Sequence, residues 1–215
     1  MKITEKLLIL ANGDFPKTQK ALDLLKSNYS LICCDGAANK CYNAGYEPDV
    51  IIGDIDSLHN KLKEIFNDRI IEIKEQNSND LSKALNWANE NDVRSVIIMG
   101  IDGGDDDHYL GNIFLLLENS YNFEIKIITN NGEFNIINSG TLSSNSNQKI
   151  SIFCLDKKAK ISSQGLKYEL NNYSFSTLYG GTLNESLGDS FTISCNKKNV
   201  NILVYRKNLE IKKNP

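Results

Sequence analysis

Short apolar runs alternate with helical patterns through about the first 130 residues, and this alternation limits the chain to few folds. Strands that are separated by single helices form a mostly parallel sheet with helices on both faces. We therefore expect an α/β fold here, with a mostly parallel sheet flanked by helices. The expected strands are Lys6–Ala11, Leu31–Cys34, Val50–Ile52, Ile70–Ile73, Ser95–Met99 and Phe123–Thr129, and the expected helices are Thr18–Ser27, Ala37–Ala44, Leu58–Phe66, Asp80–Asn91 and Tyr109–Asn119.

After about Asn130 the helical periodicity ends. Short β-rich runs follow, separated by Gly, Asn and Ser, and this pattern is typical of an all-β sandwich. We therefore expect two domains, with boundaries at residues 1–132 and 133–215. The segment Asn138–Gln148 is polar and is expected to be an exposed loop. The expected β runs are Glu133–Ile137, Lys149–Phe153, Ser190–Ser194 and Asn201–Tyr205.

The charge balance excludes several classes of partner. The 215 residues include 24 Lys and Arg against 27 Asp and Glu, which gives a net charge of −3. Nucleic acids and anionic membranes both require a clustered positive surface, so we expect neither as a partner. No apolar run approaches the roughly 18 residues of a membrane-spanning helix. Five cysteines without a C-x-x-C pair favour reduced thiols and a cytoplasmic location.

Four polar clusters follow expected strands of the first domain. They are Asn12-Gly13-Asp14, Asp35-Gly36, Gly53-Asp54-Ile55-Asp56-Ser57 and the run from Gly100 to His108. In open parallel sheets, ligands bind outside the carboxyl ends of the strands. The clusters therefore predict a binding site at this edge of the sheet.

Asp54 and Asp56 form the most informative pair. Two residues apart in an extended segment, their side chains would point to the same side. Two carboxylates so placed can share a Mg²⁺ ion, which prefers oxygen ligands. Alternatively, Asp56 or Ser57 caps the helix that is expected to begin near Leu58.

Asp80 and Lys83 are three residues apart at the start of an expected helix, so they share a helix face. A carboxylate and an ammonium at a helix N-terminus suit a metal-bound polyphosphate. The alternative is a capping residue beside a solvated lysine. The chain contains neither G-x-x-x-x-G-K-[ST] nor G-x-G-x-x-G, which excludes a P-loop kinase and leaves a standard dinucleotide fold unsupported.

These motifs, in this order, resemble those of the thiamin pyrophosphokinase family. The string from Pro48 to Ser57, which reads P-D-x-x-I-G-D-x-D-S, is the most specific of them. The other motifs that carry the resemblance are Asn12-Gly13, Asp35-Gly36-Ala37-Ala38, Gln76 to Lys83, Gly103-Gly104, Asp107-His108, Asn112, Ile150-Ser151-Ile152-Phe153, Gly165 to Leu170 and Asn184-Glu185.

The resemblance implies an enzyme that transfers a pyrophosphoryl group from ATP to thiamin, giving thiamin diphosphate and AMP. It implies that residues 1–132 bind the nucleotide and carry the catalytic groups, and that residues 133–215 bind thiamin. It also implies a homodimer with active sites between the subunits.

The resemblance further implies roles for individual residues. Asp54, Asp56 and Asp80 match the acidic positions that handle Mg²⁺ and the phosphates, and Asn184 matches a position near the thiamin site. Asp80 and Asp107 are both candidates for the group that accepts the thiamin hydroxyl proton. The expected substrate-binding residues are Asn12, Asp35, Ser57, Gln76, Asn79, Lys83, Asp107, His108, Asn112 and Asn184.

The chain departs from the family pattern at several positions. Glu75 and Asn79 replace an Asp and a Thr, Asp105 stands where an Arg is expected, and Leu183 replaces a Ser. A carboxylate replaces the planar fork of an Arg poorly at a phosphate. The sequence therefore leaves open a non-catalytic nucleotide- or thiamin-binding protein, a metal-dependent phosphohydrolase, and a structural protein.

Overall fold

The computed structural model describes residues 3–209, which divide into two compact units. One unit runs to Leu115 and also includes Tyr121–Asn130; the other consists of Leu116–Ser120 and the chain from Asn131 onwards. No helix among the described residues is long and apolar enough to cross a membrane.

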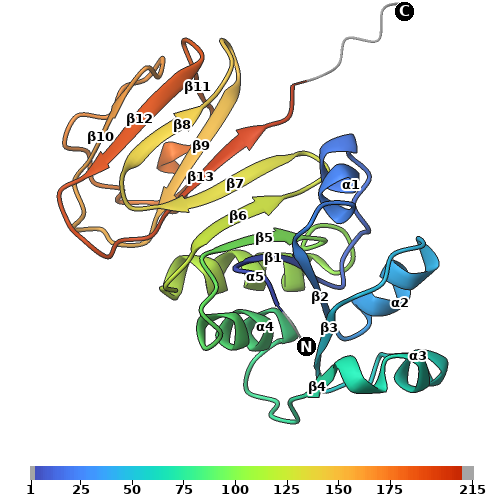
Figure 1. Cartoon of the computed structure of the whole chain (residues 1–215). Helices are drawn as coiled ribbons and strands as arrows, with labels where there is room; N and C mark the ends of the chain where they lie inside the picture. The colour runs from blue at the N-terminus through green and yellow to red at the C-terminus, as the bar shows by residue number, and fades with distance from the viewer. Residues whose placement is uncertain (1–2, 210–215) are drawn as a thin grey trace, which may run out of the picture. The chain divides into compact units, whose positions relative to one another are not determined.

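The first unit is built on six parallel strands in the order β6-β5-β1-β2-β3-β4 (Figure 1). Each strand is a short run dominated by β-branched and other apolar residues. The chain places β2, β3 and β4 on one side of β1 and then returns to place β5 and β6 on the other. This reversal next to β1 is the kind of position at which open parallel sheets bind ligands. The strands are β1 (Lys6–Leu10), β2 (Ser30–Cys34), β3 (Val50–Gly53), β4 (Ile70–Glu72), β5 (Ser95–Met99) and β6 (Glu124–Ile128).

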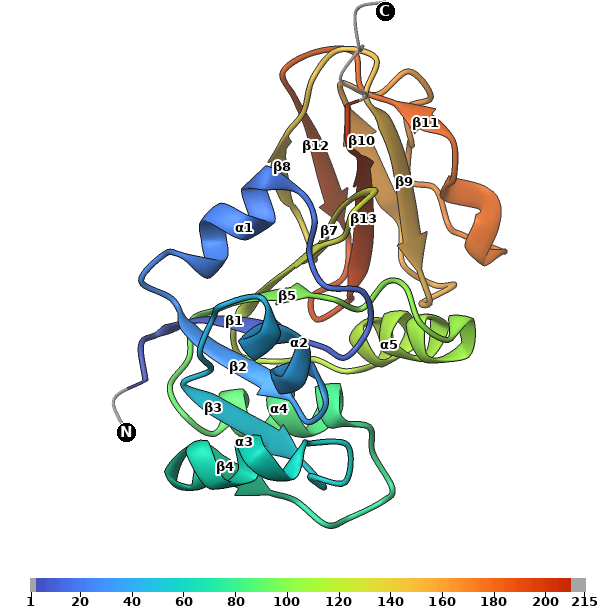
Figure 2. The same cartoon turned by 90° about the vertical axis from the view of Figure 1, so that its right-hand side faces the viewer.

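Helices cover both faces of this sheet (Figures 1 and 2). Alternate strand residues such as Leu8 and Leu10 pack in one core with apolar residues of α1, α2 and α3. On the other face, α4 packs on β2 and β3 through a buried apolar stripe. The helices are α1 (Gln19–Leu25), α2 (Ala37–Asn43), α3 (Asn60–Ile65), α4 (Asp80–Asn89) and α5 (Asp106–Glu118), and the short 3₁₀ helix η1 is Asn67–Arg69.

The second unit contains two antiparallel sheets around one core. One sheet has the order β11-β9-β13-β7 and the other the order β10-β12-β8. Inward-facing residues of both sheets, including Ile152, Ile193 and Val204, form the core between them. The elements are β7 (Gly132–Ile137), β8 (Gly140–Ser143), β9 (Lys149–Cys154), β10 (Ile161–Gln164), η2 (Leu178–Gly181), β11 (Asn184–Glu185), β12 (Ser190–Cys195) and β13 (Ile202–Lys207).

The expected fold class, a parallel α/β sheet followed by a β-sandwich, is confirmed. The expected loop Asn138–Gln148 is wrong in part, because it contains the strand β8. In that strand only Leu142 is even partly buried, so no apolar alternation marks it in the sequence. The strands β10 and β11 are likewise absent from the sequence prediction, since both are short and largely polar.

Candidate functional site

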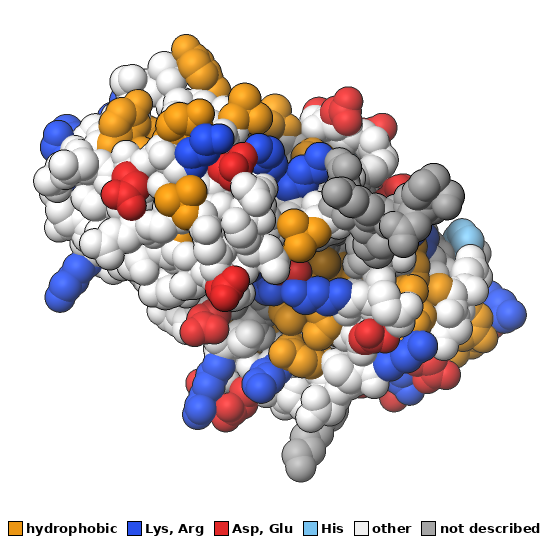
Figure 3. Space-filling view, turned by 90° about the horizontal axis from the view of Figure 1, so that it is seen from above, with side chains coloured by type: hydrophobic (Ala, Val, Ile, Leu, Met, Phe, Trp, Pro, Cys, Tyr) orange, Lys and Arg blue, Asp and Glu red, His pale blue; other side chains and the backbone are white. Residues whose placement is uncertain are grey.

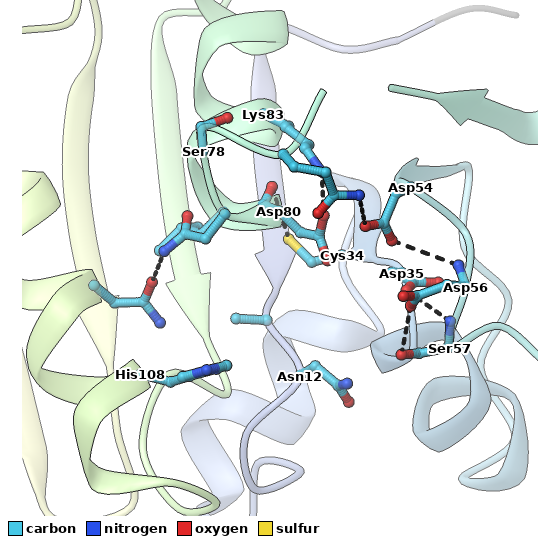
Figure 4. A pocket seen from close by; sticks show the side chains of 15 residues that line it. Asn12, Cys34, Asp35, Asp54, Asp56, Ser57, Ser78, Asp80, Lys83 and His108 are labelled. Carbon is cyan, nitrogen blue, oxygen red and sulfur yellow. Dashed lines mark hydrogen bonds and ion pairs between the residues drawn. The ribbon is translucent and has the colours of Figure 1, made fainter. Parts of the chain in front are cut away.

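A cavity of about 300 Å³ lies at the carboxyl edge of the parallel sheet (Figure 4). Residues that follow β1, β2 and β3 form one part of its wall, and the first turn of α4 and the first two turns of α5 contribute another. Eleven of the thirteen predicted site residues line it. The lining residues are Ala11, Asn12, Cys34, Asp35, Asp54, Asp56, Ser57, Gln76, Ser78, Asn79, Asp80, Leu81, Lys83, His108 and Asn112.

Three carboxylates converge in this cavity. Asp35, Asp54 and Asp56 each offer an oxygen, and these atoms lie within 4.8 Å of one another, a spacing that could hold a metal ion. The sequence prediction of an extended Asp54–Asp56 segment is wrong, because Ile55 adopts a left-handed conformation with φ 65°. A turn, not strand alternation, therefore brings the two side chains together, with the Asp56 amide donating to Asp54 Oδ1 at 3.5 Å.

Asp35 is the most buried member of the cluster, with 3% of its surface exposed. Its Oδ2 accepts a hydrogen bond from the Ser57 amide at 3.0 Å, whereas Oδ1 is buried without a partner among the described residues. Burial, together with the nearby Asp56 and Asp80, raises the pKa of Asp35 to about 6, although the hydrogen bond from the Ser57 amide acts in the opposite direction. An ionised carboxylate in this position needs a positive partner, which the cavity can supply only from a bound cation or from a rearranged side chain.

Lys83 pairs with Asp80 within the same cavity. Its side chain is 3% exposed and its Nζ lies 3.1 Å from Asp80 Oδ1, so the predicted shared helix face is confirmed and the lysine is not solvated. Burial opposes the charge of Lys83, but the hydrogen bond to Asp80 and the nearby carboxylates raise its pKa overall. Burial raises the pKa of Asp80, and Asp54 and Asp56 add to this rise, whereas the hydrogen bond and the charge of Lys83 lower it. The capping residue of α4 is Asn79, not Asp80.

The loop before α4 reaches across to the carboxylates. Gln76 Nε2 donates to Asp54 Oδ2 at 2.9 Å, and this bond holds the pKa of Asp54 below its usual range. Glu75, which departs from the family pattern, accepts from the Asn77 amide at 2.7 Å and from the Ser78 hydroxyl and amide. Glu75 therefore organises the loop that presents Gln76.

Two predicted site residues lie outside the residues that line the cavity. Asp107 is exposed in the first turn of α5. Asn184 is buried in the second unit, where its Oδ1 accepts from the Tyr168 amide at 3.1 Å and its Nδ2 donates to the Tyr168 carbonyl at 2.7 Å. Asp105, which stands at the family's Arg position, is also exposed and outside the lining.

The sequence prediction missed four residues of the lining, namely Ala11, Cys34, Ser78 and Leu81. Cys34 is buried, with its Sγ 3.7 Å from the Asp80 carbonyl oxygen. Its place as the last residue of β2, directly before Asp35, could have indicated a position at the cavity.

A parallel sheet whose carboxyl edge holds clustered carboxylates, a buried lysine and side-chain amides is typical of proteins that bind a metal-complexed phosphate compound. Two family models make the class more specific. One, described as thiamin pyrophosphokinase, catalytic domain, matches residues 21–129; the other, thiamin pyrophosphokinase, substrate-binding domain, matches residues 132–205. The chain belongs to the thiamin pyrophosphokinase family.

Curated relatives carry the same family name. Thiamine pyrophosphokinase 1 of Oryza sativa subsp. japonica is 30% identical over 110 residues, which are 40% of this chain and 42% of the rice protein. Thiamine pyrophosphokinase of Bacillus subtilis is 29% identical over 139 residues, or 60% of this chain and 65% of the relative. The matches thus span less than half of the rice protein and about two thirds of the bacterial one.

Solved structures share the fold. The thiamine pyrophosphokinase structure from Bacillus subtilis has a TM-score of 0.77 at 24% identity, covering 94% of this chain and 98% of that chain. The structure from Candida albicans has a TM-score of 0.74 at 21% identity, covering 94% and 89%.

Gly53 lets the carboxylates approach one another, and this generates a first prediction. A Cβ at this position would lie 2.8 Å from the Asp35 Cβ and 3.1 Å from Asp80 Oδ1. We expect Gly53→Ala to displace these side chains, to destabilise the protein by about 1–3 kcal/mol and to weaken Mn²⁺ binding. Chemical unfolding and Mn²⁺ titration measure the two effects.

Gly111→Ala is the matched control, because a Cβ there meets nothing within 4 Å on an exposed turn of α5. It should keep or raise stability by up to about 1 kcal/mol, since Ala favours helix more than Gly does. Equal stability and equal Mn²⁺ affinity of the two variants would show that Gly53 is not needed for the close packing of Asp35 and Asp80.

The raised pKa of Asp35 generates a second prediction. The folded protein binds a proton at Asp35 up to about pH 6, whereas an unfolded Asp releases it near pH 4. In this window the native state binds more protons than the unfolded state, so the stability contribution of Asp35 falls as pH rises. With EDTA present, the free energy of unfolding of Asp35→Asn should increase by about 2–3 kcal/mol relative to that of wild type as the pH rises from 4 to 7.

Urea unfolding of both proteins across this pH range measures that difference. A difference in unfolding free energy that is the same at every pH would contradict the assignment of a raised pKa to Asp35.

Proposed function

We propose that this protein transfers a pyrophosphoryl group from ATP to the hydroxyl of thiamin, giving thiamin diphosphate and AMP. The observation that carries the proposal is the cavity at the carboxyl edge, where three carboxylates converge beside the ion pair between buried Lys83 and partly exposed Asp80. Family membership supports the choice of substrates, since matches to both the catalytic and the substrate-binding models extend over most of the chain.

Asp35, Asp54 and Asp56 would hold the Mg²⁺ ion that we propose for this reaction. Their donor set consists of carboxylate oxygens, and Oδ1 of Asp35, which is buried with no partner in the described part of the chain, is an acceptor that a cation would satisfy. When bound, Mg²⁺ supplies positive charge that offsets the repulsion between phosphates and an incoming nucleophile. Asp80, the third acidic residue indicated by the sequence, is proposed to serve the same site from its pair with Lys83.

The side chains of the cavity have distinct proposed tasks. Catalysis of phosphoryl transfer is mostly positioning and charge neutralisation, and Gln76 fixes Asp54 through its hydrogen bond. Asp80 is the better candidate to accept the thiamin hydroxyl proton, because it lines the cavity and its pKa is raised. Asp107, the other candidate, is exposed outside the lining.

We propose that residues 1–132 form the nucleotide-binding catalytic domain and residues 133–215 the thiamin-binding domain. The match of the substrate-binding model to residues 132–205 supports this division. Asn184 has its amide engaged on both sides with the Tyr168 backbone, so we assign it the task of holding the Tyr168 loop.

Analysis of products tests the proposed function. Purified protein, Mg²⁺-ATP and thiamin should yield thiamin diphosphate and AMP in equal amounts. Release of phosphate independent of thiamin would favour the phosphohydrolase, and nucleotide binding without any turnover would favour a non-catalytic binding protein. Asp105 is exposed outside the lining, so its carboxylate does not add to the negative charge of the cavity wall.

The carboxylate cluster generates a third prediction. Asp54→Asn and Asp56→Asn each remove one negative ligand, so we expect each to lower turnover by roughly 100-fold while the fold survives. Steady-state product formation and circular dichroism measure the two properties. Asp92→Asn is the matched control, because Asp92 is exposed, lies outside the cavity and has a positive φ that Asn tolerates. Near-normal turnover in both cluster variants would rule out the proposed metal role.

Exposed apolar residues of the second unit support the proposed homodimer and generate a fourth prediction. Tyr179 is 75% exposed, Leu183 80% and Leu187 59%, and such residues typically mark an interface. Hydrophobic side chains also gather along one edge of the surface in Figure 3. We expect light scattering to give twice the mass of the chain for wild type.

Leu183→Asp should give a monomer, because Asp tolerates the positive φ of Leu183 while placing a charge in the interface. A wild-type protein that is active as a monomer at assay concentration would contradict the dimer.

A further inference from the structure

Asn79 makes two hydrogen bonds through opposite ends of its side-chain amide. It precedes α4 in an extended conformation, and its Oδ1 accepts from the Ser82 amide at 2.9 Å, which caps the helix. Its Nδ2 donates to Asn112 Oδ1 on α5, also at 2.9 Å. Asn79 thus connects the beginning of α4 to the side of α5.

The Ser82 amide determines which atom donates and which accepts in each of these hydrogen bonds. A backbone N–H can only donate, so the atom of Asn79 that faces the Ser82 amide must be its oxygen. The NH₂ group of Asn79 therefore faces Asn112, and the side-chain oxygen of Asn112 accepts its hydrogen bond. This leaves the NH₂ group of Asn112 as the end of its amide that does not face Asn79.

Asn112 is half-buried and lines the cavity, and its Nδ2 has no hydrogen-bond partner among the described residues. The carboxylates in the same cavity can only accept hydrogen bonds when ionised, so they suit a cation. A ligand that contacts both the cation and Asn112 needs acceptor oxygens at both places, and a polyphosphate has them.

We propose that Asn79 is a positioning residue that turns Asn112 into a hydrogen-bond donor for a phosphate oxygen of the bound nucleotide. The inference rests on the proposed function for the identity of the ligand. Thr, the residue that the family pattern places at position 79, could cap α4 through its hydroxyl but has no NH₂ group with which to orient Asn112.

Asn79→Asp tests the polarity without altering Asn112. The carboxylate keeps an oxygen for the Ser82 amide but presents only acceptors to Asn112. Asn112 then turns its NH₂ group toward position 79 and presents its oxygen to the cavity. We expect the Kd for Mg²⁺-ATP, measured by calorimetry, to rise about tenfold, or about 1.4 kcal/mol.

A double-mutant cycle separates this reorientation from the added charge. In the Asn112→Ala background there is no amide at position 112 to reorient, so Asn79→Asp should change the Kd only through its added charge. The fold-change in Kd should therefore be at least about fivefold smaller than in the wild-type background. High salt reduces the charge effect in both backgrounds. Asn79→Thr keeps an uncharged capping residue on α4 and is the control for changing the cap. It should weaken Mg²⁺-ATP binding less than Asn79→Asp does.

The outcomes are distinguishable. A larger effect of Asn79→Asp in the presence of Asn112 supports the inference, whereas the same effect in both backgrounds, or no binding of Mg²⁺-ATP by wild type, overturns it. Product formation is measured separately. If wild type binds Mg²⁺-ATP but makes no thiamin diphosphate, the proposed function fails while the cycle still decides the role of Asn79.

Discussion

The buried carboxylate of Asp35 is the constraint on which the candidate site depends. Its Oδ1 has no partner among the described residues, and Asp54, Asp56 and Asp80 add negative charge around it. Such an arrangement costs stability unless a proton or a cation offsets the charge. The buried negative charge destabilises the protein when no cation is bound, and a bound cation would neutralise it. Such a cavity is suited to binding a nucleotide complexed with Mg²⁺.

The surrounding backbone holds this arrangement in place through close approaches. Gly13 donates to the Gly100 carbonyl at 2.7 Å, and the Asp14 amide donates to the Asp102 carbonyl at 2.7 Å, so the loops after β1 and β5 lock together. A Cβ on Gly13 would lie 2.5 Å from two of these carbonyl oxygens. Backbone contacts therefore pre-organise the loops that follow β1 and β5 at the carboxyl edge.

Much of this could be predicted from the sequence. Buried parallel strands such as β1 and β5 are continuous apolar runs, and their topology brings the clusters after β1, β2 and β3 to one edge. The left-handed turn at Ile55 and the burial of Asp35 could not be predicted, because both depend on packing between segments far apart in the chain. For the same reason, the sequence could not show that Asn79 engages Asn112.

The position of a bound divalent cation decides whether the three carboxylates of the cavity form a metal site. Crystals soaked in Mn²⁺ should show one anomalous peak within coordination distance, about 2.0–2.3 Å, of oxygens from Asp35, Asp54 and Asp56. A peak at the exposed carboxylates of Asp105, Asp106 and Asp107, with none at the cavity, would show that Asp35, Asp54 and Asp56 do not bind the ion.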